Sequence, residues 1–287
     1  MRVGVIGQGF VGTAVREGLK QHYKIHTYDL KEKCTEKCIS DVVIESKVIF
    51  VCVPTPMKKD GSCDTSIVES VVSEIDTIVE DLKYIAEINQ HKRIIVIKST
   101  VPPGTTERLN KECKYIEVVF NPEFLTEANF IDDFKNQDRI IIGGPRPAAT
   151  IVRRLFYKVF PKAHIIKTSS TIAEMVKYTT NTFLSVKVSF ANEIKQVCDK
   201  VGIDYDKVTE YATYDDRLGK SHWSVPGPDG HYGFGGSCFP KDINALISFS
   251  DDLNLWLHTL KGAWNTNCEV RPEEDWKELK GRAVVDE

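Results

Sequence analysis

Cys238 stands in a glycine-rich decapeptide, Gly233 to Asp242, whose residue types suit covalent chemistry. Three of its first four residues are glycine, and glycine lets backbone approach a ligand where a side chain would block it. Lys241 and Asp242 follow the cysteine by three and four residues. A nearby ammonium favours the thiolate, which is the nucleophilic form. The pattern indicates a candidate nucleophile, although a cysteine taken alone is more often a small buried side chain.

The other cysteines indicate no disulfide framework and no metal centre. The chain has 8 cysteines in 287 residues, and a chain of this length needs no covalent staples. Cys34 and Cys38 could form half of a zinc site, but no second Cys/His pair completes a tetrahedral set. We therefore expect reduced thiols, a cytoplasmic location and no bound metal.

A dinucleotide site is predicted at the N-terminus. A short apolar strand, 3–6, runs into Gly7, Gly9 and Gly12 spaced as G-x-G-x-x-G, and a helix-like run follows from Thr13 to Gln21. The first glycine makes the turn, the second admits a pyrophosphate and the third lets helix and strand pack closely. The free N–H groups of the helix N-terminus then face the phosphates.

Asp29 indicates which dinucleotide this site favours. It ends the second expected strand, 24–28, about 20 residues after the first glycine, where a carboxylate binds the ribose 2′-hydroxyl and repels a 2′-phosphate. A lone glycine motif is weak, but its setting together with Asp29 favours NAD over NADP.

Further strands follow at the spacing of an α/β fold. The expected strands 48–53 and 93–98 end at Pro54–Pro56 and at Ser99–Thr100, with a helical segment 64–82 between them. Apolar strands that alternate with helices indicate a parallel sheet covered on both faces, whose ligands lie beyond the carboxyl ends of the strands. Pro54, Thr55 and Thr100 are therefore candidate contacts, or plain turn residues.

Two pairs of polar residues are candidates for acid–base and oxyanion chemistry. Glu123 and Glu127 would share one face if a helix begins there, and their repulsion would raise one pKa; the alternative is a solvated first turn. An unbroken segment, 171–201, predicts one long helix that carries Lys177 and Asn181 four residues apart. That pair could donate to an oxyanion, or be part of a polar stripe facing water.

The amino-acid composition and the order of the expected strands and helices together indicate the architecture of the chain. A hydrophobic content of 41%, a charged content of 28% and a net charge of −3 exclude a basic nucleic-acid surface, and no apolar stretch is long enough to span a bilayer. The N-terminus leads directly into a strand, so no signal peptide is expected. We predict an α/β fold in which a Rossmann-like doubly wound sheet, 1–168, precedes an all-α domain, 169–287. This second domain is expected to contain the long central helix and further helices over 242–250 and 253–268.

Taken together, these motifs resemble the UDP-glucose/GDP-mannose dehydrogenase family. The segments GQGFVG, VPTP, STVPPGT, NPEFLTE, EMVKYTTNTF and GFGGSCFPKD occur in this order between Gly7 and about residue 268. Members oxidise the C6 hydroxymethyl of a nucleotide sugar to a carboxylate with two NAD, through a cysteine thiohemiacetal and thioester. The resemblance thus implies a UDP-glucose 6-dehydrogenase-like enzyme, with a place in polysaccharide biosynthesis.

The resemblance also implies roles for individual residues. Cys238 would be the nucleophile, with Lys177 and Asn181 as oxyanion donors. Glu127, Thr100 and Asp242 would place or activate water, and Glu123 would act in acid–base steps. The resemblance assigns the sugar pocket to Phe124, Leu125, Gly235 and Gly236. It assigns the cofactor site to Gly7, Gly9, Phe10, Val11, Gly12, Asp29, Pro54, Thr55, Thr100 and Lys241. Arg217 resembles an arginine that reaches the substrate of a neighbouring subunit, which implies a homodimer along the long helix.

The sequence departs from the family pattern at two places. The loop 221–232 before the cysteine is expanded, and its His222 and His231 could touch substrate, although loop histidines are usually solvated. Family members carry a third, C-terminal domain that binds the nucleotide, of which Leu279 to Val284 resembles only the first strand.

Two alternatives stay open. A two-domain hydroxyacid or 6-phosphogluconate-type dehydrogenase shares the layout and the Lys-x3-Asn helix, but it needs no thiol. The chain could also be a non-catalytic remnant that binds NAD and dimerises.

Overall fold

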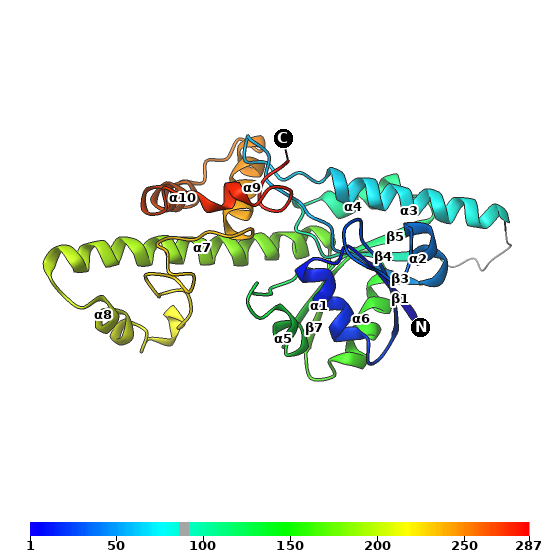
Figure 1. The fold of residues 1–287 in the computed structure, drawn as a ribbon, viewed down its shortest axis with the longest axis horizontal. Coiled ribbons are helices and arrows are strands. Elements are labelled where there is room, and N and C mark those ends of the chain that lie inside the picture. The colour runs from blue at the N-terminus through cyan, green and yellow to red at the C-terminus, as the bar shows by residue number, and fades with distance from the viewer. Residues whose placement is uncertain (86–91, 287) are drawn as a thin grey trace. The chain divides into compact units, whose positions relative to one another are not determined.

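The chain forms a seven-stranded sheet followed by helices. A computed structural model describes residues 1–85 and 92–286 (Figure 1). Continuous runs of Val and Ile build the strands, because both of their faces are buried. The strands are β1 Arg2–Ile6, β2 Lys24–Tyr28, β3 Val48–Val51, β4 Arg93–Ile97, β5 Ile116–Phe120, β6 Arg139–Gly143 and β7 His164–Thr168.

The strand order is β2-β1-β3-β4-β5-β6-β7, and the first five strands are parallel. β6 runs antiparallel to β5 and parallel to β7, so the last two strands reverse the direction of the sheet. The chain order switches between β1 and β3, and such a switch opens a crevice beyond the carboxyl ends of the two strands. The glycine turn after β1 lies at this switch.

Helices cover both faces of this sheet (Figure 1). One face packs with α1, α5 and α6 in a cluster that includes Val5, Leu19 and Phe156. The other packs with α2, α3 and α4 in a cluster that includes Val51, Ile75 and Leu109. These helices are α1 Phe10–Leu19, α2 Ile39–Glu45, α3 Ser66–Ile85, α4 Thr105–Glu112, α5 Phe130–Lys135 and α6 Ala148–Val159.

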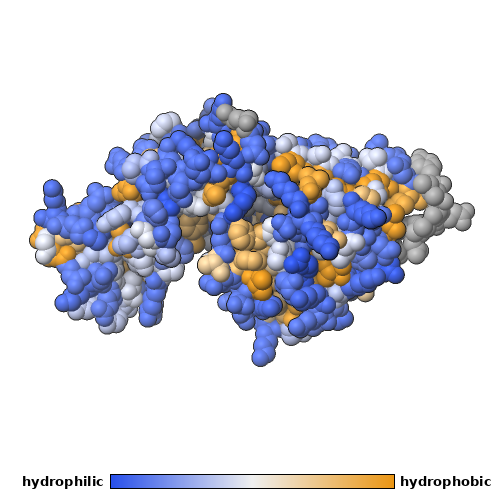
Figure 2. Space-filling view, viewed as in Figure 1, coloured by the Kyte–Doolittle hydropathy of each residue, from blue (hydrophilic) through white to orange (hydrophobic). Residues whose placement is uncertain are grey.

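The part of the chain that follows β7 contains only helices among the elements that the structure describes. Helix α7, Ser170–Val201, is the long helix that the sequence predicts, and it lacks proline and glycine throughout. The remaining elements are α8 Tyr205–Ala212, η1 Asp216–Leu218, α9 Phe239–Asp252, α10 His258–Val270 and η2 Asp275–Glu278. Figure 2 shows a largely hydrophilic surface, with hydrophobic colour at the end of α7 where the chain turns toward α8.

Backbone contacts divide the chain into two compact units. The first comprises Met1–Thr55 and Thr65–Lys177, and the second comprises Pro56–Asp64 and Tyr178–Glu287. The short segment 56–64 joins the second unit through Met57, whose N–H donates to the Ala283 carbonyl (2.8 Å) and whose carbonyl accepts from Val285 (3.0 Å). The predicted boundary at residue 168 stays a prediction.

Three element boundaries differ from those expected. Helix α1 begins inside the glycine motif, at Phe10 rather than Thr13, and α9 begins at Phe239 rather than Asp242. The expected helix from Leu253 is wrong at its start: Asn254 has a φ of 57°, which breaks the helical path, and α10 begins at His258. The segment 279–284 is a tight turn with isolated bridges rather than a strand.

A buried carboxylate holds the start of α4. Glu174 of α7 has no exposed surface, and its two oxygens accept from the backbone N–H of Gly104 (2.6 Å) and of Thr106 (2.8 Å). These are unpaired donors of a helix N-terminus, which favours negative charge. Burial nevertheless raises the pKa of Glu174, and the bonds to the α4 backbone offset only part of that rise.

Replacing Glu174 should destabilise the first unit. Glu174→Ala leaves two buried N–H groups without acceptors, so we expect the free energy of unfolding to fall by about 1–3 kcal/mol. The exposed Glu107→Ala in the same region is the control. Because the folded pKa lies above the unfolded one, wild-type stability relative to Glu174→Gln should fall as pH rises from about 4.5. Urea unfolding at several pH values measures both effects, and equal midpoints for all variants would contradict them.

Candidate functional site

The glycine turn after β1 has an open side and a closed side. A Cβ on Gly7 would lie 2.6 Å from the Cys52 carbonyl oxygen, and the φ of Gly7 is 89°. A Cβ on Gly12 would lie 1.8 Å from the Gly7 carbonyl oxygen, so only glycine allows this approach of helix to strand. Gly9 has nothing within 4 Å of a built Cβ and is the N-cap of α1. The backbone around Gly9 is therefore free to receive a phosphate.

Asp29 braces the same turn. Its Oδ2 accepts from the Gln8 N–H at 2.7 Å, and its Oδ1 accepts from the backbone of Lys31 and Glu32. Partial burial alone would raise the pKa of Asp29, but these three N–H donors hold it below its usual value. Asp29 is thus a fixed carboxylate after β2. Of the other predicted cofactor residues here, Phe10 is exposed and Val11 is half-buried.

The ends of β3 and β4 are tied to each other. The Ser99 hydroxyl donates to the Val53 carbonyl at 2.6 Å, which joins the two segments that the sequence places at neighbouring strand ends. Thr55 and Thr100 are both buried, and Pro54 is exposed. The two predicted turns therefore lie at one edge of the sheet.

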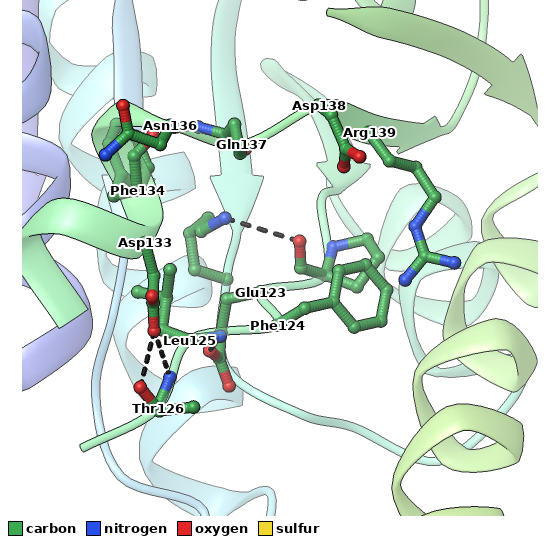
Figure 3. A pocket seen from close by; sticks show the side chains of 12 residues that line it. Glu123, Phe124, Leu125, Thr126, Asp133, Phe134, Asn136, Gln137, Asp138 and Arg139 are labelled. Carbon is green, nitrogen blue, oxygen red and sulfur yellow. Dashed lines mark hydrogen bonds between the residues drawn. The ribbon is translucent and has the colours of Figure 1, made fainter. Parts of the chain in front are cut away.

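The segment after β5, 121–126, is held by polar contacts with residues outside it, and Figure 3 shows those between Thr126 and Asp133. The Asn121 side chain donates to the Ile141 carbonyl at 2.7 Å. Thr126 donates to Asp133 through both its N–H (2.8 Å) and its hydroxyl (2.6 Å). The Arg139 guanidinium lies 4.2 Å from the centre of the Phe124 ring. This segment has no regular secondary structure, but most of its residues have a hydrogen bond or a cation–π contact.

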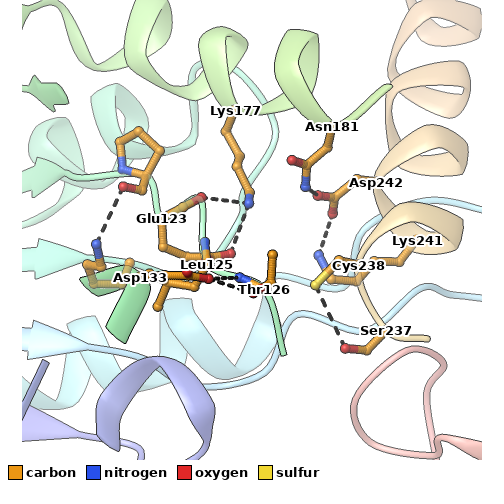
Figure 4. A network of polar contacts seen from close by, with 12 residues as sticks. Glu123, Leu125, Thr126, Asp133, Lys177, Asn181, Ser237, Cys238, Lys241 and Asp242 are labelled. Atoms are coloured by element: carbon orange, nitrogen blue, oxygen red, sulfur yellow. Dashed lines mark hydrogen bonds and ion pairs between the residues drawn. The ribbon is translucent and has the colours of Figure 1, made fainter. Parts of the chain in front are cut away.

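Glu123 and Lys177 form a buried ion pair (Figure 4). Lys177 Nζ lies 2.9 Å from Glu123 Oε1 and donates to the Glu123 carbonyl at 2.7 Å. The other oxygen, Oε2, accepts from the Leu125 N–H at 2.8 Å. Burial alone would raise the pKa of Glu123, but the Lys177 ammonium holds it below its usual value.

The expected pairing of Glu123 with Glu127 is wrong in its geometry. Residues 121–126 are not helical, and α5 starts only at Phe130. Glu123 is buried while Glu127 is exposed. Proline at position 122 and the bond from Lys177 to the Glu123 carbonyl both favour extended backbone over a helical turn. The pKa of Glu123 falls because of Lys177, instead of rising through a second carboxylate.

The glycines of the cysteine loop have different surroundings. A Cβ on Gly233 would lie 2.4 Å from Asn267 Oδ1, and a Cβ on Gly235 would lie 2.4 Å from Arg271 Nη2. Only Gly236 of these three faces open space, and its φ is 70°. Two of the glycines therefore serve close packing inside the second unit, and one leaves its backbone accessible.

Polar side chains from two helices fix this loop. Asn192 of α7 accepts from the Gly233 N–H at 3.1 Å. Asn267 of α10 accepts from the Phe234 N–H at 2.7 Å and donates to its carbonyl at 3.0 Å. The buried Arg271 pairs with Asp275 at 2.6 Å. The loop that looks flexible in sequence is thus held rigidly.

Cys238 is the N-cap of α9, and a buried polar network lies one turn further (Figure 4). Asp242 accepts from the Asn181 amide at 2.6 Å and pairs with the ammonium of Lys241. Burial alone would lower the pKa of Lys241, but Asp242 first, with Cys238 and Cys63, raises it. The half-buried Cys238 sulfur lies 3.9 Å from the Ser237 hydroxyl. The helix N-terminus and Lys241 both favour a negative sulfur.

The other predicted residues lie on the surface of the second unit. Arg217 is exposed, and its Nε lies 2.9 Å from Asp215 Oδ1. His231 is exposed beside Glu273, at 3.0 Å. His222 differs from the expectation of a solvated histidine, because it is half-buried beside Phe239 and burial lowers its pKa.

Protein-family comparison decides the relationship. Residues 15–161 match the NAD-binding domain of the UDP-glucose/GDP-mannose dehydrogenase family, and residues 171–269 match the central domain of the same family. The chain belongs to this family. It therefore carries the NAD-binding domain of the UDP-glucose/GDP-mannose dehydrogenases, and NAD is the cofactor that this domain binds.

Curated relatives agree with this assignment. UDP-glucose 6-dehydrogenase TuaD of Bacillus subtilis is 35% identical over 240 residues, covering 81% of this chain and 49% of that protein. UDP-glucose 6-dehydrogenase of Rhizobium meliloti is 36% identical over 260 residues, covering 86% of this chain and 54% of the relative. The chain thus spans about half the length of these relatives.

Solved structures show the same fold. A UDP-glucose dehydrogenase from Pyrobaculum islandicum has a TM-score of 0.83 at 29% identity, covering 95% of this chain and 68% of the other. A GDP-mannose dehydrogenase from Pseudomonas aeruginosa has a TM-score of 0.65 at 25% identity, covering 98% and 71%. A 3-hydroxyisobutyrate dehydrogenase from Mycobacterium tuberculosis has a TM-score of 0.74 at 13% identity, covering 96% and 95%, which shows only a shared fold.

The described residues contain neither a membrane-spanning helix nor a metal-binding cluster. None of the helices in residues 1–85 and 92–286 is both long and apolar enough to cross a bilayer. Within the same ranges, no cluster of three or more His, Cys, Asp or Glu side chains could hold a metal ion. All eight cysteines are free thiols.

Several residues that shape the site escaped the sequence reasoning. The side chains of Lys98, Asn121 and Gln8 donate to backbone carbonyls near the strand ends. Arg271 and Asn267 hold the cysteine loop through backbone hydrogen bonds. A lysine at the end of an apolar strand is a visible signal, because burying an ammonium requires a partner. Nothing local marks Asn267, whose partner lies 33 residues earlier.

Alanine substitutions at two glycines should separate packing from helix propensity. Gly235→Ala places a methyl group against Arg271 and Asp275, so we expect a loss of about 1–3 kcal/mol of unfolding free energy. Gly262→Ala, inside α10 with open space around it, should instead gain up to about 1 kcal/mol. Thermal unfolding of both variants tests this, and a stable Gly235→Ala would contradict the packing of the loop.

Proposed function

We propose that the chain acts in an NAD-dependent nucleotide-sugar 6-dehydrogenase, which oxidises the C6 hydroxyl of a UDP-sugar to a carboxylate. UDP-glucose is the proposed substrate, as in the names of the curated relatives. The single observation that carries the proposal is Cys238 at the N-terminus of α9, beside Lys241 and the Asp242–Asn181 hydrogen bond. A dehydrogenase that stops at an aldehyde has no use for a nucleophilic thiol in this setting.

The thiol accounts for the second half of the oxidation. When bound, NAD accepts a hydride in each of two steps. After the first, the Cys238 thiolate adds to the aldehyde carbon, forming a C–S bond and a negative oxygen. Loss of a hydride from that carbon leaves a thioester. Water then adds to the thioester carbon and the C–S bond breaks, which regenerates the Cys238 thiolate and releases the carboxylate, while the two protons of the water pass to solvent.

The oxyanion and the water need other groups. Lys177 and Asn181, one helical turn apart on α7, are proposed to donate hydrogen bonds to the negative oxygen. Glu127, Thr100 and Asp242 are proposed to place or activate water. Asp242 is suited to this because it is a buried acceptor.

Further roles follow the family pattern. Glu123 is proposed for acid–base steps, since the Lys177 pair keeps it ionised and ready to accept a proton. Phe124, Leu125, Gly235 and Gly236 are proposed to contact the sugar. For the cofactor we propose the residues Gly7, Gly9, Phe10, Val11, Gly12, Asp29, Pro54, Thr55, Thr100 and Lys241.

Two other readings remain testable. A two-domain hydroxyacid or 6-phosphogluconate-type dehydrogenase would perform one hydride transfer and would need no thiol. The 3-hydroxyisobutyrate dehydrogenase of Mycobacterium tuberculosis shares the fold of this chain. A chain that binds NAD without turnover would be a non-catalytic dimeric remnant. The nucleophilic setting of Cys238 favours the two-step oxidation over both.

Product stoichiometry separates these readings. With UDP-glucose and NAD, we expect two NADH for each sugar consumed, because the thioester route oxidises the carbon twice. Cys238→Ala should abolish this steady production, while Cys268→Ala, a half-buried thiol in α10, should leave it intact. Absorbance at the NADH band, with a parallel panel of UDP- and GDP-sugars, measures this. One NADH per substrate in both variants would favour the hydroxyacid alternative, and NAD binding without turnover would favour the remnant.

We also propose that the chain forms a homodimer through α7, and that it works in the cytoplasm. Phe183, Phe190 and Val197 lie seven residues apart and are exposed by 66%, 48% and 57%. Residues at that spacing fall on one face of a helix, where a second helix can pack. Val201 extends the same apolar stripe. Arg217 is proposed to reach the substrate of the partner.

Charge on this stripe should separate the subunits. We expect the wild-type chain to have twice its chain mass of 32.4 kDa in solution. Phe183→Glu combined with Phe190→Glu should give monomers, because like charges would face each other in an apolar contact. Tyr157→Glu, at another exposed aromatic residue, is the control and should stay dimeric. Light scattering after size exclusion measures the masses. A wild-type monomer at micromolar concentration would rule out the dimer.

A further inference from the structure

Lys98 is a buried lysine to which the proposed reaction assigns no role. It follows β4 directly and is only 2% exposed. Its Nζ donates to Asn121 Oδ1 at 3.0 Å and lies 3.4 Å from the Pro122 carbonyl. An ammonium is rarely buried this deeply, and it persists only where acceptors and charges offset the loss of water.

The acceptors of Lys98 lie immediately before Glu123. The Asn121 N–H donates to the Ile97 carbonyl at 2.9 Å, and its side chain donates to the Ile141 carbonyl at 2.7 Å. Lys98 therefore completes a set of bonds that joins the turn at Asn121, which follows β5, to the strands β4 and β6. The residue after this turn, Glu123, carries the pair with Lys177.

Charges surround Lys98 on several elements. Burial lowers the pKa of Lys98 to about 8, with Glu123 and Cys52 opposing the shift and Lys177 adding to it. Cys52, after β3, stays a neutral thiol because burial raises its pKa to about 12. One carboxylate, Glu123, therefore serves two buried ammonium groups, one from β4 and one from α7.

A cavity lies beside this cluster (Figure 3). It measures about 360 Å³, and its lining includes Lys98, Glu123, Asp133, Asp138 and Arg139. The Phe134 ring of α5 lies 5.8 Å from Lys98 Nζ. The cavity leaves room for a larger cationic side chain at position 98.

We propose that Lys98 is a positioning residue for the Glu123–Lys177 pair: its ammonium holds the Asn121–Pro122 turn to the sheet and shares the buried charge of Glu123. This inference rests on the proposed function for its effect on turnover. A charge-assisted donor binds its acceptors more strongly than a neutral amine does. As Lys98 loses its proton with rising pH, the turn and the carboxylate after it are held less firmly.

Turnover of three proteins tests this proposal. Lys98→Met removes the ammonium, and we expect kcat to fall by on the order of tenfold with KM for NAD unchanged. Lys98→Arg keeps a charge at every accessible pH and should retain most of kcat at pH 7. The ratio of wild-type to Lys98→Arg kcat should fall as pH rises through about 8. A flat ratio between pH 6.5 and about 9.5, with full activity in Lys98→Met, would overturn the proposal.

Hydrogen exchange gives a readout that does not depend on turnover. The Leu125 N–H is protected by Glu123 Oε2, so a poorly held turn should expose it. We expect peptides covering 121–126 to exchange several-fold faster in Lys98→Met than in Lys98→Arg, with no difference over 233–242. Unchanged exchange over 121–126 would refute the positioning role, even if the chain oxidises no nucleotide sugar. Faster exchange over 121–126 in a chain without any turnover would support the positioning role of Lys98 and contradict the proposed reaction instead.

Discussion

The buried ion pair between Glu123 and Lys177 is the constraint on which the conformation of the segment 121–126 depends. An ionised carboxylate can stay out of water only with an opposite charge and full hydrogen bonding. Lys177 supplies the charge, and the Leu125 N–H satisfies the second oxygen. The same lysine also binds the Glu123 carbonyl, so one side chain of α7 sets both the backbone and the carboxylate. An irregular segment is thereby as well defined as the strand before it.

In each unit, one sequence motif lies at a helix N-terminus, which carries a partial positive charge. In the first unit, Gly9 is the N-cap of α1 and leaves open backbone for a phosphate. In the second unit, Cys238 is the N-cap of α9, where the helix dipole favours a thiolate. Both helices begin earlier than the sequence predicts. The first turn of α1 contains Gly12 and that of α9 contains Pro240, and neither residue type favours a helix. The early starts matter, since they place the chemistry of each motif at the helix end instead of in a preceding loop.

The sequence predicted the elements well where a local pattern was strong. Apolar runs identified the first four strands, and an unbroken segment identified α7. Prediction failed at a local backbone break that the apolar pattern does not show, and at a contact between residues far apart in the sequence. Asn254 interrupts the expected helix because its φ is positive. Glu123 does not share a helix with Glu127, because Lys177, which lies 54 residues later, binds it. A Cβ on Gly233 would meet Asn267 and a Cβ on Gly235 would meet Arg271, so both glycines are required for close packing, which the local sequence does not indicate.

The sequence by itself determined the family, the NAD-binding architecture and the identity of the candidate nucleophile, because ordered motifs and strand periodicity are local properties of a chain. Tertiary structure alone decided which charges meet. Lys98 and Lys177 are 79 residues apart, yet both contribute to the charge environment of Glu123. No spacing rule predicts such a cluster, since it arises from the meeting of a strand end, a loop and a helix. The proton affinities on which the proposed chemistry depends follow from that burial.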